Sequence, residues 1–230
     1  MSTEKIPLVK PLIQACKSAD KKGLQQVMYI IMKNEISNDE LNFADKSGRT
    51  ALSYICTTCE TGFAKFLLQF KGIDVNRPDN EGNTPLHFAA ATGQSDIITM
   101  LVNRNSLIDA KNSLGITPLM KAAIQGHTDS AKRLMLANAS PSLKDPGRGF
   151  TARDWARLCG RKFCADALSE LMKKHRATDM SAKQRTDWKI SLQSLIPTKA
   201  SRTQQQLSQQ KEGTRPFIDN VTRPIQTRLF

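Results

Sequence analysis

The chain has 230 residues, of which 34 are Lys or Arg and 21 are Asp or Glu, giving a formal net charge of +13. Apolar residues make up 39%, with only two Trp and two Tyr. This content is low for one hydrophobic core over the whole chain, so we expect part of the chain to lie outside the core. The longest apolar run, residues 27–32, is far shorter than the about 20 residues of a transmembrane helix. Five Cys are too few for a disulfide scaffold of this size, so we expect a cytoplasmic or nuclear protein.

A period of 33 or 34 residues organises the chain up to residue 173, and it is marked by Thr50, Thr84, Thr117 and Thr151. Each Thr follows a Gly-containing tight turn and suits the N-cap of a helix. Pro follows two of these Thr residues, at the position where a helix tolerates it best. We therefore expect each unit to begin with a turn and a short helix.

A second helix is predicted in each unit, because an apolar face follows the glycine that ends the first helix. In one unit this face comprises Ile97, Ile98, Leu101 and Val102. A single helix pair cannot bury such a face, whereas a stack of three or more pairs can. The start of the chain predicts a further unit of this kind. Residues 11–16 resemble the first helix of a unit, and a longer loop precedes residues 41–44.

The segment Thr84-Pro85-Leu86-His87-x-Ala89-Ala90 resembles the signature of the ankyrin repeat family, and residues 74–76 and 108–110 match its repeat-ending segment. The resemblance implies an all-α solenoid of about five helix-turn-helix repeats with β-turn tips. The repeat domain spans residues 6–173, with units at about 6–44, 45–78, 79–111, 112–144 and 145–173. Cys59 replaces the helix-ending glycine of the second unit, so we expect its first helix to end differently.

The fifth unit differs from the others, since it has one extra residue in its turn and Arg153 in place of a leucine. An Arg suits a terminal repeat, whose outer face meets water. The segment from Pro146 to Arg157 is similar to the last repeat of the photoreceptor ankyrin repeat protein group. That resemblance implies a nuclear transcriptional co-regulator.

Residues 174–230 form a basic, Gln- and Ser-rich tail with a net charge of +7, which we expect to be mostly disordered. The run at residues 173–176 is typical of a solvated tail, a nuclear-import signal or a phosphate contact, and the first of these is favoured. Trp188, Leu192, Leu195 and Ile196 have helical spacing and predict a short helix that docks on a partner or on the repeats.

No motif supports catalysis. Cys56-Thr57-Thr58-Cys59 has the spacing of half a zinc site, but Cys159 and Cys164 lie three repeats away, so we expect these Cys to fill space between helices. His87 belongs to the repeat signature, where it hydrogen-bonds the turn backbone. We expect no enzyme activity, no cofactor and no metal.

The family binds partners through the turn tips and the concave face of the first helices, and this rule is carried over to matching positions. The second and third units contribute polar candidates, which are Lys46, Arg49, Asn80, Glu81 and Asn83. The fourth and fifth contribute a predicted apolar stripe of Leu114, Ile116, Ile124, Phe150 and Leu158, with Arg148, Gln125 and Asn112 at its rim. The tail helix is an alternative occupant of this stripe.

The sequence therefore predicts a monomeric, non-enzymatic protein-interaction module, an adaptor or scaffold, which binds a protein partner through its concave face. The alternative is a nuclear transcriptional co-regulator that binds transcription factors. We expect no membrane span, and we expect no direct contact with nucleic acid because the tail lacks interleaved aromatic residues.

Overall fold

A computed structural model describes residues 9–33, 36–58 and 60–173 of the chain, which divides into the units Met1–Arg176 and Ala177–Phe230. Within the described residues, helices are joined by turns, and the only β pairing is an isolated bridge between Ala44 and Thr50. The predicted all-α architecture is confirmed for this part of the chain. The predictions for Trp188 and the rest of the tail lie outside the described residues.

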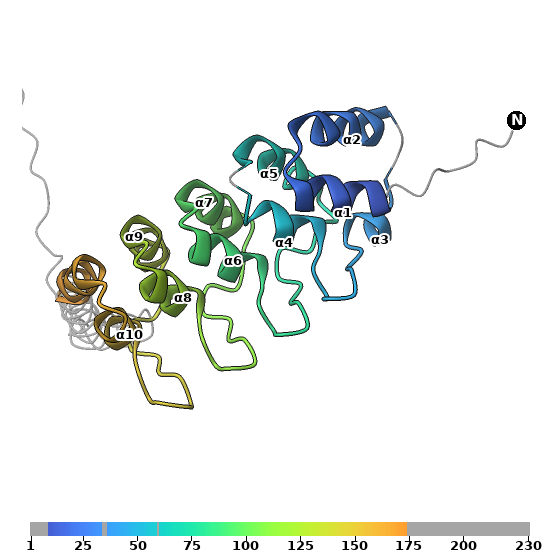
Figure 1. Cartoon of the computed structure of the whole chain (residues 1–230). Helices are drawn as coiled ribbons and strands as arrows, with labels where there is room; N and C mark the ends of the chain where they lie inside the picture. Colours follow the sequence, from blue (N-terminus) through green and yellow to red (C-terminus); the bar gives the residue numbers. More distant parts are fainter. Residues whose placement is uncertain (1–8, 34–35, 59, 174–230) are drawn as a thin grey trace, which may run out of the picture. The chain divides into compact units, whose positions relative to one another are not determined.

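The helices come in pairs along the chain (Figure 1). A short helix, α3 (Asn38–Leu41), lies in the long first loop. The pairs are α1 (Val9–Ser18) with α2 (Lys21–Lys33), α4 (Ala51–Ile55) with α5 (Thr61–Leu67), α6 (Pro85–Thr92) with α7 (Ser95–Asn103), α8 (Pro118–Gln125) with α9 (Thr128–Leu136), and α10 (Ala152–Leu158) with a helical segment over residues 162–173.

The pairs stack into two layers. The first helices α1, α4, α6, α8 and α10 each pack against the next, and α5, α7 and α9 do the same in the second layer. Turns project from the first layer to one side, as Figure 1 shows. The core lies between the layers, where Leu52, Leu86 and Leu119 occupy equivalent positions and are at most 1% exposed. Small alanine pairs let the helices approach closely, since Ala89, Ala90, Ala122 and Ala123 are all fully buried.

The helix boundaries follow from the residues that cap them. The Thr50, Thr117 and Thr151 hydroxyls accept hydrogen bonds from backbone N–H groups at the third helical position. Gly93 ends α6 in the left-handed region at φ 79°, as a helix-ending glycine does. In the second unit, α4 has only five residues and ends at Cys56 with φ −63°, so this helix ends differently from those of the central units, as the sequence predicts. Cys59 itself lies outside the described residues.

Replacement of Leu86 by Ala tests the stacking. Leu86 is fully buried in the central unit, so its truncation should leave a cavity between neighbouring helices and lower the free energy of unfolding by about 2–5 kcal/mol. Leu136→Ala is the control, because this side chain is 75% exposed and its loss should change stability by about 0.5 kcal/mol or less. Urea unfolding followed by circular dichroism measures both. Equal losses for the two variants would contradict the stack.

Candidate functional site

The turns that project from the first layer are each held by one Asp or Asn side chain. Asp45, Asp79 and Asn112 accept hydrogen bonds through Oδ1 from the backbone N–H groups two and four residues later, at 2.8–3.1 Å. In the longer fifth turn Asp145 uses both carboxylate oxygens, since Oδ2 accepts from the Arg148 N–H at 2.7 Å and Oδ1 from the Phe150 N–H at 2.8 Å. These bonds fix the shape of each turn and therefore the direction of its tip.

Neighbouring turns are also bonded to each other. The Asn80 N–H donates to the Ser47 carbonyl at 3.1 Å, and the Ser113 N–H donates to the Glu81 carbonyl at 2.9 Å. Glycine is needed at this contact, because a Cβ on Gly82 would lie 2.9 Å from the Ser113 nitrogen. The tips of the second, third and fourth units therefore form a bonded row rather than independent loops.

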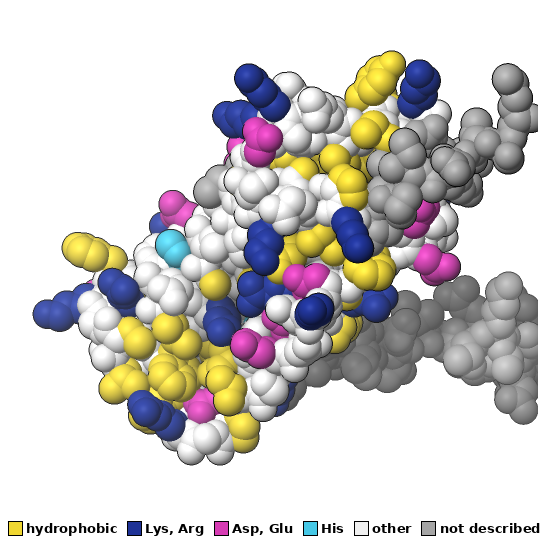
Figure 2. Space-filling view, turned by 45° about the vertical axis from the view of Figure 1, so that its right-hand side comes forward, with side chains coloured by type: hydrophobic (Ala, Val, Ile, Leu, Met, Phe, Trp, Pro, Cys, Tyr) yellow, Lys and Arg dark blue, Asp and Glu magenta, His cyan; other side chains and the backbone are white. Residues whose placement is uncertain are grey.

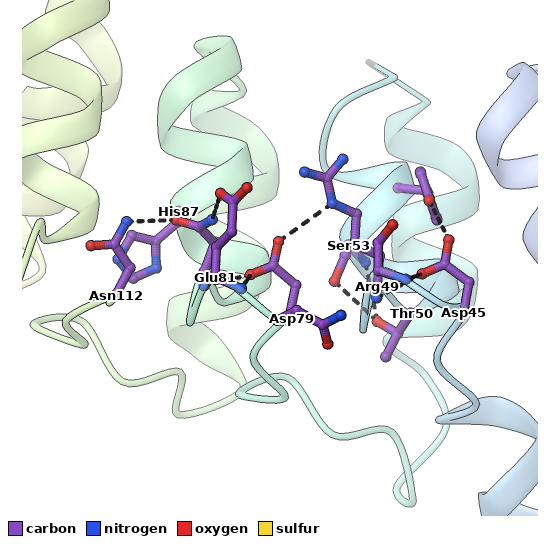
Figure 3. A network of polar contacts seen from close by, with 12 residues as sticks. Asp45, Arg49, Thr50, Ser53, Asp79, Glu81, His87 and Asn112 are labelled. Carbon is purple, nitrogen blue, oxygen red and sulfur yellow. Dashed lines mark hydrogen bonds and ion pairs between the residues drawn. The ribbon is translucent and has the colours of Figure 1, made fainter. Parts of the chain in front are cut away.

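Side chains reinforce this row, as the close view in Figure 3 shows. Arg49 Nε lies 3.4 Å from Asp79 Oδ2, and Asn112 Nδ2 donates to Asn83 Oδ1 at 2.9 Å. Two predicted surface residues are therefore corrected. Asn83 is 3% exposed and Asn112 is 7% exposed, because each uses its amide to join two turns.

Arg49 also contacts aromatic side chains of the array. Its guanidinium lies 4.7 Å from the centroid of the Phe88 ring and about 6 Å from that of Tyr54, in addition to its ion pair with Asp79. The side chain is about one third exposed, so one edge remains available to a partner. Lys46, Asn80 and Glu81 are exposed at the tips, as the sequence predicts.

His87 bridges two units from inside α6. It is 1% exposed, and its Nδ1 accepts from the Thr84 N–H at 3.1 Å, so that the proton lies on Nε2, which donates to the Ile116 carbonyl at 2.9 Å. Burial is the largest influence on this imidazole and lowers its pKa to about 4. A further prediction is corrected here, because Ile116 is 6% exposed, belongs to the core and is not part of an open apolar stripe.

An aromatic corner occupies the fifth turn. The Phe150 and Trp155 rings meet edge to face with centroids 5.6 Å apart, and the Arg148 guanidinium lies 5.4 Å from the Trp155 ring. The Trp155 indole N–H donates to Asp145 Oδ1 at 3.1 Å, which fixes the ring. The pKa of the Asp145 carboxyl is lowered, mainly because the carboxylate accepts a hydrogen bond from the Arg148 N–H and further ones from the N–H groups of Phe150 and Trp155. Desolvation acts in the opposite direction and is outweighed.

The remaining predicted residues of these two units are exposed, except Ile124 and Phe150, which are half-buried. Leu114 is 68% exposed and Leu158 is 54% exposed, Gln125 and Arg148 are exposed, and Ile124 is half-buried. The two tips adjoin, since Pro146 lies directly against Gly115. We define the apolar patch as Leu114, Ile124, Phe150, Trp155 and Leu158. Figure 2 shows hydrophobic side chains gathered at the lower left, beside a Lys or Arg side chain.

Trp155 belongs to this patch but was not among the predicted binding residues. Its position in the first helix matches no turn-tip position, so the family rule passes over it. The residue type itself could have indicated Trp155 as a binding residue. Trp supplies a large apolar ring together with one polar N–H group, a combination typical of binding surfaces.

Other chemistry is sparse in the described part of the chain. No group of three or more His, Cys, Asp or Glu side chains there has the arrangement of a metal site. Cys56 is fully buried, and desolvation raises the pKa of its thiol. Desolvation also raises the pKa of the Cys16 thiol, to about 12. Cys164 is buried and Cys159 is exposed. None of the helices in this region has both the length and the apolar character needed to cross a membrane.

Comparison with known proteins gives a consistent result. The family model described as ankyrin repeats (3 copies) matches residues 6–112, and that described as ankyrin repeat matches residues 114–146, so that together they cover more than half of the chain. The chain is 33% identical over 138 residues to an IkB-like protein of African swine fever virus (strain Badajoz 1971 Vero-adapted), which is 56% of this chain and 58% of the viral protein. It therefore spans little more than half the length of this relative.

Two cellular proteins are also similar. Protein fem-1 homolog A-like of Mus musculus is 28% identical over 145 residues, which is 63% of this chain and 20% of that protein. Neurogenic locus notch homolog protein 1 of Xenopus tropicalis is 34% identical over 140 residues, which is 60% of this chain and 5% of that protein. The shared region is thus part of proteins of different sizes.

The buried His87 predicts a pH dependence of stability. The pKa of this imidazole is about 6.5 in the unfolded chain and about 4 in the folded protein. Between these two pH values the unfolded chain binds the proton and the folded protein does not. The stabilising contribution is complete above about pH 6.5 and should be lost as the pH falls toward 4, by about 1.4 kcal/mol per pH unit at most.

The comparison of wild type with His87→Gln isolates this effect, because Gln does not titrate. Free energies of unfolding in urea at pH 4.5, 5.5, 6.5 and 7.5 should fall less steeply for the variant as the pH falls below 6.5. The same slope in both proteins would show that another group controls the pH dependence.

Proposed function

The chain belongs to the ankyrin repeat family, and we propose that it is a non-enzymatic adaptor or scaffold that binds a protein partner through the apolar patch of its fourth and fifth units. The family supports a role in protein–protein interaction. The patch carries the finer proposal, because two exposed leucines and a fixed aromatic pair belong to two adjacent units.

The energetics of the patch suit a protein partner. Leu114 and Leu158 have more than half of their surface in water, which a partner surface would remove. Phe150 and Trp155 are already held against each other and Trp155 is bonded to Asp145, so that little side-chain freedom is lost on binding. Arg148 and Gln125 supply a polar rim, as is usual around the apolar centre of an interface.

Bonds between units hold the turn tips of the second, third and fourth units in a rigid row. The backbone bonds from Ser47 to Asn80 and from Glu81 to Ser113 connect successive tips, and Lys46, Asn80 and Glu81 extend the exposed surface away from the patch. We therefore place the strongest contacts in the fourth and fifth units and weaker polar contacts in the second and third. The protein would act as a monomer in the cytoplasm or the nucleus.

A second candidate, a nuclear transcriptional co-regulator, is favoured by two features of the sequence. These are the basic run at residues 173–176 and the similarity of residues 146–157 to the last repeat of the photoreceptor ankyrin repeat protein group. The run crosses the end of the described residues. This candidate keeps the same binding surface and adds nuclear import and a transcription factor as the partner.

Charge introduced into the patch should abolish partner capture. The variant Leu114→Lys/Leu158→Lys places two charges in the apolar patch, and because both side chains are exposed the fold should be kept. Quantitative mass spectrometry after affinity capture from cell lysate should show specific partners reduced at least tenfold, the loss expected when a hot spot of about 1.4 kcal/mol or more is removed.

The matched control is Leu107→Lys/Leu136→Lys, which makes the same change of charge at leucines that are 59% and 75% exposed elsewhere. Partners should be retained by this control. Equal retention by both variants would exclude the patch, and equal loss would show a general effect of charge.

The second candidate makes a separate prediction. Lys173→Ala/Lys174→Ala/Arg176→Ala removes the cations of the basic run, so nuclear accumulation of the full chain should fall if the run directs import. Imaging of tagged wild-type and variant protein measures this. An unchanged distribution would remove the support that the run gives to the nuclear candidate.

A further inference from the structure

A groove at the other end of the array has no role in the proposed function. It lies along α1, has a volume of ≈ 560 Å³, and is lined by Pro11, Ile13 and Gln14 on the helix and by Phe43 in the segment that leads to the second turn. Phe43 is 48% exposed, although a large aromatic side chain in an array of this kind is expected to be covered. The groove therefore offers an apolar wall to solvent.

Cations stand at both ends of this wall. Lys10 and Lys17 are exposed residues of the groove lining, two helical turns apart on α1, and neither forms an ion pair with any residue that the structure describes. Lys17 lies 5.9 Å from the centroid of the Tyr54 ring, which holds the ammonium group close to the groove. Lys46 is exposed at the tip of the adjoining turn. In Figure 2, Lys and Arg side chains flank hydrophobic ones in the right half of the view.

The acidic group in the groove is already engaged. Asp45 accepts hydrogen bonds from the Tyr54 hydroxyl and from the N–H groups of Ser47 and Arg49, so its lone pairs serve the turn. The neighbouring carboxylate, Asp79, is 7% exposed and paired with Arg49. Lys17 also attracts the Asp45 carboxylate, so that two cations and one anion leave the groove lining with one net positive charge for a ligand.

The cationic character is limited to the α1 side of Phe43. A smaller hollow of ≈ 390 Å³ on the other side of this ring is lined by Asp39 and Asp74 together with Arg77. An anionic ligand would be repelled there and attracted to the Lys10–Lys17 side. The charges thus distinguish the two sides of one aromatic side chain.

We propose that the α1 groove binds an acidic peptide segment that inserts one leucine or phenylalanine side chain between Pro11, Ile13 and Phe43. The carboxylates that flank this anchor pair with Lys10 and Lys17. The apolar anchor supplies most of the affinity by leaving water, and the ion pairs supply orientation and a fast encounter. This site is separate from the apolar patch, so the array carries two binding surfaces of different chemistry.

The probe is a fluorescein-labelled heptapeptide, Asp-Glu-Asp-Phe-Asp-Glu-Asp, titrated with the full chain and followed by fluorescence anisotropy at low salt. The variant Lys10→Glu/Lys17→Glu should weaken binding about tenfold or more, because two attractions become repulsions. Lys65→Glu/Lys71→Glu is the matched control, since it makes the same change of net charge at exposed positions of α5 and the loop after it. It should change the affinity by less than twofold, because its charges lie outside the groove.

Two further probes separate this proposal from general attraction to a chain of net charge +13. A peptide with Ser in place of Phe keeps all carboxylates and should bind at least fivefold more weakly, since the anchor is lost. Phe43→Ala should weaken the Phe peptide and leave the Ser peptide almost unchanged. Circular dichroism melts of each variant establish that the fold is kept.

Three outcomes would overturn the proposal. Equal weakening by both double variants would show that net charge alone attracts the peptide. Equal binding of the Ser and Phe peptides would show that the apolar wall is not used. Tighter binding of a single-stranded octathymidylate, with the same sensitivity to Lys10→Glu/Lys17→Glu, would assign the groove to nucleic acid. Because the apolar patch is unchanged in these variants, each outcome leaves the proposed function to its own test.

Discussion

The structure depends on one recurring interaction, in which the side chain of one Asp or Asn accepts two backbone N–H groups at the base of each turn. Asp45, Asp79 and Asn112 do this with nearly the same geometry, and Asp145 adapts it to a longer turn. Such a turn would otherwise bury polar backbone groups without partners, which is costly. Because the second, third and fourth turns are also bonded to one another, the interaction that closes each of them also orders their row of tips.

Both proposed binding surfaces lie where this regular row is interrupted. In the central units Asn83 and Asn112 are buried because they join two turns, and Ile116 is buried in the core. The fifth turn has an extra residue, and there Phe150 and Trp155 form a fixed aromatic corner next to the exposed Leu114. At the first unit, α1 leaves one wall of a groove in solvent beside Phe43. The two ends of the array therefore carry both proposed binding surfaces.

The sequence predicts the fold well because the fold is local. The spacing of Thr50, Thr84, Thr117 and Thr151 and the capping residues around them determine where the first helices begin, and stacking follows from the buried Leu86 and its equivalents. The sequence predicts the binding surface only in part. Which tip residues remain exposed depends on bonds between units, such as that from Asn112 to Asn83, 29 residues apart. The groove arises between α1 and Phe43, and no motif marks it.

The central claim is that the protein binds a partner through the turn tips and first helices of the fourth and fifth units. Hydrogen–deuterium exchange of the full chain, alone and with a captured partner, tests it most directly. The account predicts slower exchange on binding in residues 113–125 and 147–158, with the second-layer helices α5, α7 and α9 unchanged. Protection confined to the second layer, with none at the tips of the fourth and fifth turns, would contradict it.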